Sequence, residues 1–175
     1  MNIYTRTGDA GETSLFGGTR ISKSSLRVWC YGSIDEANCA LGMVAAHTPF
    51  VEIKKVIARM QKKMFVVASE LASDAEGLTM LKERICQEDV DFLEGVIDNF
   101  INKHGEITKF VTPGETITSA HLHVARSTVR RAERYIITLN AEEEISPVLR
   151  KYVNRLSDAL FALANEVLYM EIVEY

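Results

Sequence analysis

Cysteine, proline and long hydrophobic runs are all scarce in this sequence. The three cysteines, Cys30, Cys39 and Cys86, show no C-x-x-C spacing, which favours free thiols in a reducing compartment over disulfides or a cysteine-bound metal. No stretch approaches the roughly eighteen consecutive apolar residues of a membrane-spanning helix, and the N-terminus has no apolar segment typical of a signal peptide. We therefore expect a cytoplasmic protein that does not cross a membrane.

Motifs for metal ions and for nucleic acid are also missing. The four histidines form no H-E-x-x-H motif, and the paired E-x-x-H motifs of ferritin-like metal bundles are absent. The net charge is −4, without a long run of Lys or Arg, so nothing indicates a nucleic-acid partner or a membrane surface. With 175 residues, 47% of them hydrophobic, the chain has the size and composition of a single domain over 1–175.

Apolar residues recur in alternating steps of three and four along three long segments. Such a row lies on one face of a helix. The rows are Ile53, Ile57, Met60, Met64, Val67 and Leu71; Leu122, Ala125, Val129, Ala132, Ile136 and Leu139; and Leu149, Val153, Leu156, Leu160, Leu163, Val167 and Met170. Shorter helices are expected over 33–47 and 88–103, and residues 105–115 read as an extended connection. The sequence therefore predicts an all-α fold, a five-helix antiparallel bundle.

The helix boundaries have fewer signals. Ser146 and Pro147 have the residue types of an N-cap and a first helical residue, so we expect the last helix to begin there. Asp35 and Glu36 are expected in the first turn of the first helix, where the helix dipole favours anions. Alternatively, one of these carboxylates pairs with an arginine of another helix or subunit.

A glycine-rich N-terminal loop, "YTRTGDAGETSLFGG" at 4–18, precedes the bundle. Its glycines permit positive φ and a close backbone approach, and its N–H and hydroxyl groups are donors of the kind that phosphates accept from. However, neither G-x-x-x-x-G-K-[ST] nor G-x-G-x-x-G is present. The residues alone leave three alternatives, which are a phosphate-binding loop, a frayed terminus and a hairpin.

Three arginines form a stripe on the fourth predicted helix. Arg126, Arg130 and Arg134 follow each other at steps of four, with Glu133 beside them. Like charges at this spacing repel each other by roughly a few tenths of a kcal/mol per pair unless an anion compensates. The stripe is either a solvated basic face or a site for phosphate or carboxylate, which the arginine fork fits.

The last predicted helix carries a second polar face beside its apolar row. These residues are either the polar edge of the row or groups aimed at a ligand. They are Asn154, Asp158, Phe161 and Asn165.

Three stretches together resemble the signature blocks of the PduO-type ATP:cob(I)alamin adenosyltransferases. They are "YTRTGDAGETSLFGGTRISKSSLRVWCYGSIDEANCALG", "RSTVRRAER" and "NRLSDALFALA", in the family's order and spacing. The resemblance covers essentially the whole chain and divides it into an ATP-binding segment, 1–27, and a helical bundle, 28–175. It implies that cob(I)alamin attacks the 5′ carbon of ATP and expels triphosphate, giving adenosylcobalamin. It also implies Mg²⁺ with the ATP and a homotrimer with active sites between subunits.

The resemblance assigns roles to individual residues. Asp35 and Arg126 match a pair that forms a salt bridge across the family's subunit interface, and Phe110 matches an aromatic on the corrin side, where the lower axial cobalt ligand is displaced. Catalytic roles fall on Arg126, Arg130, Phe110 and Asp35, and cobalamin contacts on Phe110 and Asp35. Mg²⁺ would be held mainly through the phosphates. The ATP-binding residues are Thr5, Arg6, Thr7, Gly8, Asp9, Ala10, Gly11, Glu12, Thr13, Lys23, Arg130, Glu133, Arg134 and Asn154.

The sequence departs from the family at Asn165, where many members have arginine. It also ends at Tyr175, whereas some members have a longer tail that closes over the corrinoid, so we expect the closure to come from elsewhere. A cob(II)alamin reductase and an adenosylcobalamin-dependent enzyme are possible partners. Two alternatives remain at this stage, a bundle that hydrolyses ATP or transfers its phosphoryl group, and a non-catalytic corrinoid carrier or adaptor.

Overall fold

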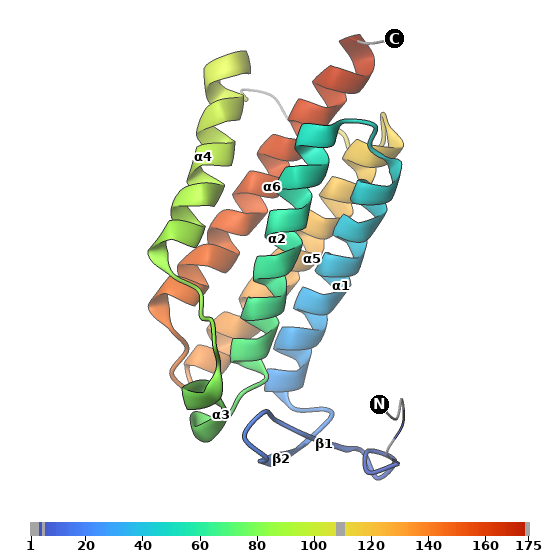
Figure 1. The fold of residues 1–175 in the computed structure, drawn as a ribbon. Coiled ribbons are helices and arrows are strands. Elements are labelled where there is room, and N and C mark those ends of the chain that lie inside the picture. The colour runs from blue at the N-terminus through green and yellow to red at the C-terminus, as the bar shows by residue number, and fades with distance from the viewer. Residues whose placement is uncertain (1–3, 5, 108–110, 174–175) are drawn as a thin grey trace.

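The fold is an elongated bundle of long antiparallel helices with a small β-hairpin at one end (Figure 1). The computed structural model describes residue 4 and residues 6–107 and 111–173. Among these residues no helix is long and apolar enough to cross a membrane. The elements are β1 (Glu12–Ser14), β2 (Arg20–Ser22), α1 (Leu26–His47), α2 (Val51–Leu71), α3 (Ala75–Met80), α4 (Gln87–His104), α5 (Ile117–Asn140) and α6 (Pro147–Val173).

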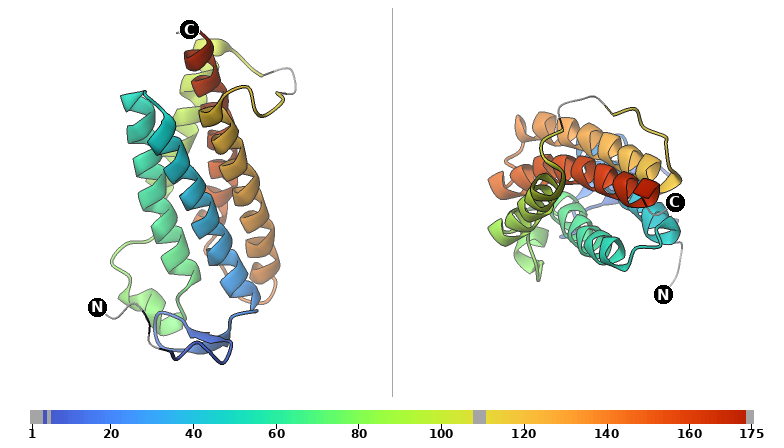
Figure 2. Two further views of the ribbon diagram at one scale, coloured as in Figure 1. Left: turned by 90° about the vertical axis from the view of Figure 1, so that its right-hand side faces the viewer. Right: turned by 90° about the horizontal axis from the view of Figure 1, so that it is seen from above.

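The five predicted helices are confirmed as α1, α2, α4, α5 and α6. A short sixth helix, α3, was not predicted, because its six residues are too few to show a periodic row. Helix α6 begins at Pro147, as predicted from its start signal. Helix α5 packs against both α1 and α6, and the outer contacts are between α1 and α2 and between α4 and α6 (Figure 2).

The prediction for the start of the first helix is wrong. Helix α1 begins at Leu26, where the Ser25 side chain accepts a hydrogen bond from Val28 N. Asp35 and Glu36 therefore lie in the middle of α1 and not in its first turn, and no acidic residue stands in that turn. The misleading signal is Gly32, which resembles a break before the helix but lies inside it.

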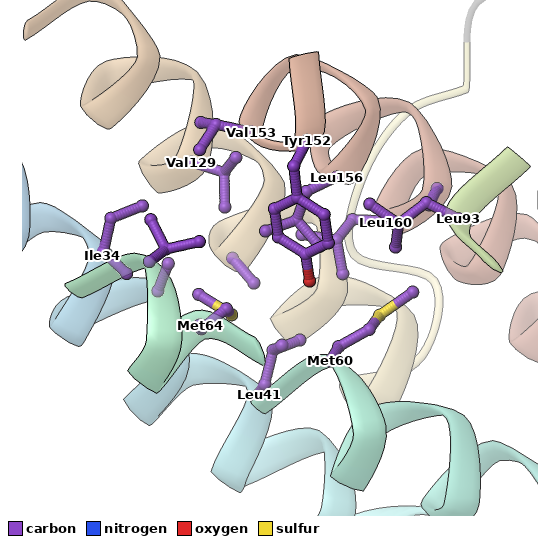
Figure 3. Packing of buried hydrophobic residues seen from close by; sticks show 14 of the residues in the cluster. Ile34, Leu41, Met60, Met64, Leu93, Val129, Tyr152, Val153, Leu156 and Leu160 are labelled. Atoms are coloured by element: carbon purple, nitrogen blue, oxygen red, sulfur yellow. The ribbon is translucent and has the colours of Figure 1, made fainter. Parts of the chain in front are cut away.

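The three predicted apolar rows supply most of the core, to which side chains of α1 and α4 also contribute. All members of the rows are buried except Met170, which is partly buried against the cluster. Tyr152 is the largest fully buried side chain, and it points between Met60 and Met64 of α2 and Leu160 of α6 (Figure 3). Burial of this kind supplies the main stabilisation of a helical bundle, at about 25 cal/mol per Å² of apolar surface.

The second half of the glycine-rich loop is a hairpin that is docked on the bundle. Phe16 N donates to Ala72 O at 2.8 Å, and Asp74 N donates to Phe16 O at 3.0 Å. The Asp74 carboxylate then accepts from Gly77 N at 2.8 Å and from Thr19 N at 3.0 Å. These backbone hydrogen bonds, with the bond from Gly77 as the largest cause, lower the pKa of Asp74 to about 2. Of the three alternatives, a frayed terminus is thus wrong for residues 12–22.

The hairpin backbone lies close to Gly77 of α3, and we predict that Gly77→Ala separates the hairpin from the bundle. A Cβ atom there would lie 1.8 Å from the carbonyl oxygen of Phe16. The expected result is faster amide exchange at Phe16 and Thr19 with a lower melting temperature. The control is Gly95→Ala in α4, where nothing lies within 4 Å of the added atom, so stability should be unchanged or rise by up to about 1 kcal/mol. Wild-type exchange in Gly77→Ala would contradict this picture of the docking.

Candidate functional site

Two cations hold the first half of the N-terminal loop against β2. Arg20 donates through Nη2 to Thr7 O at 2.8 Å and through Nη1 to Ser14 Oγ at 3.3 Å. Lys23 donates through Nζ to Gly8 O at 2.8 Å, while its backbone N–H donates to Gly11 O at 2.8 Å. These bonds fold the loop back on the hairpin.

The described part of this loop is open to solvent. Gly8 and Thr13 are half-buried, and Thr5 lies outside the described residues. Arg6 has a positive φ of 61°, which is uncommon for a residue other than glycine, and its guanidinium lies 5.4 Å from the centroid of the Tyr4 ring. The remaining predicted ligand residues of the loop are exposed: Arg6, Thr7, Asp9, Ala10, Gly11 and Glu12.

The arginine stripe lies along α5 where α5 meets α6. Arg130 and Arg134 are exposed, and neither has an ion pair with a carboxylate in the part of the chain that the structure describes. Glu133 instead accepts a hydrogen bond from Asn154 Nδ2 of α6 at 2.8 Å. The structure thus brings four of the predicted ATP-binding residues to one side of the α5–α6 pair.

Arg126, the first arginine of the stripe, is half-buried. Its Nε donates to His123 Nδ1 at 3.3 Å, and its Cζ lies 5.8 Å from the centroid of the Phe161 ring. Burial first and the neighbouring Arg130 second lower the pKa of Arg126. The sequence did not single out His123 for this contact, although its H-x-x-R spacing places it on the same helix face as Arg126.

Asp35 is not brought to this stripe within one chain. Asp35 is exposed on α1 and forms no ion pair with Arg126, whereas the adjacent Glu36 pairs with Arg131. Phe110 lies outside the described residues. Asn165, at the position where many family members have arginine, is buried and donates to Phe161 O of its own helix at 2.7 Å.

The loop and the stripe are also separate. Within the described ranges no hydrogen bond or ion pair joins residues 8–13 to Arg126, Arg130 or Arg134. The loop lies at the hairpin end of the bundle, and the end of α4 and the start of α5 lie at the opposite end (Figure 1). Helix α5 alone has 24 residues, which corresponds to a length of about 36 Å.

A cleft at the hairpin end of the bundle coincides with neither half of this site. It has a volume of about 470 Å³ and lies between the hairpin, α1, α3 and the connection from α5 to α6. Its wall includes Asp74 and the run Glu142–Glu144, and its one arginine, Arg27, is paired with Glu143. This acidic lining is unsuited to a triphosphate. Among the residues described, the cleft included, no group of three or more His, Cys, Asp or Glu could hold a metal ion.

Comparisons with known proteins all identify the same family. The family model for cobalamin adenosyltransferase matches residues 3–167. The corrinoid adenosyltransferase of Citrobacter freundii is 48% identical over 163 residues, which is 93% of each chain. The corrinoid adenosyltransferase PduO of Salmonella typhimurium is 42% identical over 165 residues, covering 94% of this chain and 49% of that protein.

Solved structures give the same result. A PduO-type ATP:corrinoid adenosyltransferase from Lactobacillus reuteri, a phenylalanine-to-alanine variant complexed with cobalamin and ATP, is 34% identical with a TM-score of 0.89, covering 97% of this chain and 95% of that one. An arginine-to-lysine variant of the Lactobacillus reuteri protein, complexed with ATP, has a TM-score of 0.87 at 34% identity, with the same coverage. The sequence match over nearly the whole chain and the shared fold show that this chain belongs to the cobalamin adenosyltransferase family.

Proposed function

We propose that the protein is an ATP:corrinoid adenosyltransferase. It transfers the 5′-deoxyadenosyl group of ATP to the cobalt of cob(I)alamin and releases triphosphate. The observation that carries the proposal is the stripe of Arg126, Arg130 and Arg134, which has no carboxylate partner in the described structure, in a chain that belongs to this family. By contrast, three other arginines on the long helices form ion pairs with glutamates. They are Arg27 on α1, Arg131 on α5 and Arg155 on α6.

The stripe suits the leaving group. Triphosphate gains negative charge as the bond to the 5′ carbon breaks, and fixed guanidinium groups stabilise charge that develops in the transition state. Bound phosphate also offsets the repulsion among arginines at steps of four. Because the corrinoid supplies the nucleophile, the protein needs no activated serine, cysteine or histidine. Its residues bind, orient and stabilise charge.

The N-terminal loop would hold the other end of the triphosphate. The Lys23 ammonium has three N–H donors and uses one on Gly8 O, so two are available to phosphate oxygens. The exposed Arg6 guanidinium adds a second positive charge beside the loop. Mg²⁺ enters as MgATP, and its charge is balanced mainly by the phosphates.

The separation of the two halves supports an active site between subunits of a homotrimer. In one chain the loop lies at the hairpin end, and Asp35 and Arg126 do not pair. A neighbouring subunit would bring the loop to the stripe and Asp35 to Arg126. In addition, α1 and α5 expose apolar side chains that such an interface would cover, namely Trp29, Met43, Val124 and Ile137.

Phe110 would act on the corrin. An apolar ring on the lower face excludes water or the base from the axial position, and cobalt without that donor is easier to reduce. A cob(II)alamin reductase would then supply the electron, and the product would pass to an adenosylcobalamin-dependent enzyme. We place the protein in the cytoplasm, a reducing compartment that suits its free cysteines.

The central test is an anaerobic assay with protein, MgATP and chemically reduced cobalamin. We expect the cob(I)alamin absorbance to convert to that of adenosylcobalamin, with one triphosphate released per product. A phosphoryl-transfer enzyme would release ADP or phosphate without corrinoid, and a carrier would show no turnover. Absence of conversion above a protein-free control would overturn the proposed function.

Neighbouring arginines provide a matched pair of variants for the same assay. Arg130→Leu should lower kcat by about 10²- to 10³-fold, because it removes a charge that stabilises the leaving group. Arg131→Leu removes an arginine that already pairs with Glu36 on α1, so its kcat should stay near that of the wild type. Equal kcat values for the two variants would contradict the role given to the stripe.

Binding of MgATP should order the first half of the loop. We expect slower protease cleavage over 4–18 when MgATP is added, because a ligand offsets the entropy cost of ordering the glycines. Lys23→Met should speed cleavage without nucleotide, since it removes the bond to Gly8 O, and should weaken the protection by MgATP. Lys62→Met, a change of an exposed lysine on α2, is the control. If MgATP did not change the rate at which the wild type is cleaved, this role of the loop would be contradicted.

A further inference from the structure

His123 is a buried histidine in direct contact with the arginine stripe. Its side chain is 4% exposed, and its Nδ1 accepts a hydrogen bond from Arg126 Nε at 3.3 Å. Its Nε2 is fully enclosed and has no hydrogen-bond partner among the described residues. A buried polar atom without a partner is costly, so an apolar side chain would suit packing alone better than a histidine does.

The contact with Arg126 determines the protonation state of the ring. A guanidinium nitrogen can only donate, so Nδ1 must offer its lone pair and the proton must sit on Nε2. An imidazolium could not accept this hydrogen bond. Burial first and the charge of Arg126 second lower the pKa of His123, and no charged group of α1 or α6 contributes to that shift. The ring is therefore neutral at neutral pH.

A neutral acceptor leaves the charge of Arg126 uncompensated, whereas a carboxylate would offset it. Arg27, Arg131 and Arg155 are held by glutamates, which offset their charge. Arg126 is oriented through Nε by a neutral ring, and the Phe161 ring lies near its Cζ, at 5.8 Å. Its two terminal nitrogens have no partner in the described part of the chain. The full charge and the fork of Arg126 thus remain available to an anionic group.

We propose that His123 is a positioning residue for Arg126. Its neutral imidazole fixes the direction of the guanidinium and leaves the charge uncompensated for a carboxylate of an adjacent subunit or for a phosphate. The role in turnover rests on the proposed function, in which Arg126 belongs to the active site. The hydrogen-bond geometry does not rest on it.

The first experiment measures the tautomer, without an activity assay. Long-range ¹H–¹⁵N spectra of protein labelled at its four histidines should show a protonated Nε2 and an unprotonated Nδ1 for His123, identified by loss of its signals in His123→Asn. Replacement of Arg126 by leucine should shift the Nδ1 signal. A protonated Nδ1, or an Nδ1 signal that does not shift in Arg126→Leu, would overturn the inference.

The second experiment compares two variants of nearly equal shape. His123→Asn keeps an acceptor close to the position of Nδ1, whereas His123→Leu removes it. We expect kcat to fall by about 10- to 100-fold in the leucine variant, as for a misplaced group near the reaction, and to be largely restored in the asparagine variant. Melting temperatures should not follow this order, because leucine suits a buried site at least as well as asparagine.

A double-mutant cycle separates positioning from a general structural effect. In an Arg126→Leu background, His123→Leu should cause no further loss, because both changes remove the same contribution. His121→Leu is the control, since His121 lies two residues away and its ring centroid is 5.6 Å from that of His47, in a tilted contact. Independent losses from the two changes, or equal kcat values for the leucine and asparagine variants, would overturn the positioning role. An inactive wild type with the expected tautomer would overturn the proposed function alone.

Discussion

Burial of the apolar row of α5 between α1 and α6 is the constraint on which the rest of the structure depends. The row from Leu122 to Leu139 is buried, and α5 packs against both α1 and α6. Rotation of α5 would therefore expose the row. Because Arg126, Arg130 and Arg134 are offset from that row on the same helix, burying the row turns the stripe outward beside α6. A hydrophobic contact thereby decides where positive charge is presented.

Some arginines of the bundle are paired with carboxylates, and within the described residues those of the stripe are not. Some arginines that join elements are paired with carboxylates, as Arg27 is with Glu143 and Arg131 with Glu36. The stripe has only neutral or indirect support, from His123, Phe161 and the neighbouring Glu133–Asn154 bond. Ion pairs between elements stabilise this fold modestly, whereas uncompensated charge on a packed helix favours binding of an anion. The hairpin shows a similar division, since Asp74 anchors its base while Lys23 and Arg20 hold its solvent-facing loop.

Local patterns predicted the long helices well and their ends less well. The periodic rows extend over many residues, so one unexpected residue does not hide them. The start of α1 was misplaced because Gly32 has a low helix propensity, yet packing of α1 against α5 and α2 keeps the helix continuous through it. The role of His123 was missed for a related reason. A histidine was weighed only as a metal ligand, and its value as a neutral acceptor appears only when its burial is known.

The sequence by itself determined the helical class, the buried rows, the arginine stripe and the family, because periodicity and motifs are local properties of the chain. Only the tertiary structure decided that the hairpin docks at Asp74, that Asp35 and Arg126 stay apart within one chain, and that the loop and the start of α5 lie at opposite ends of the bundle. Those relations join residues far apart in sequence. They depend on the length and direction of rigid helices, which no single segment encodes.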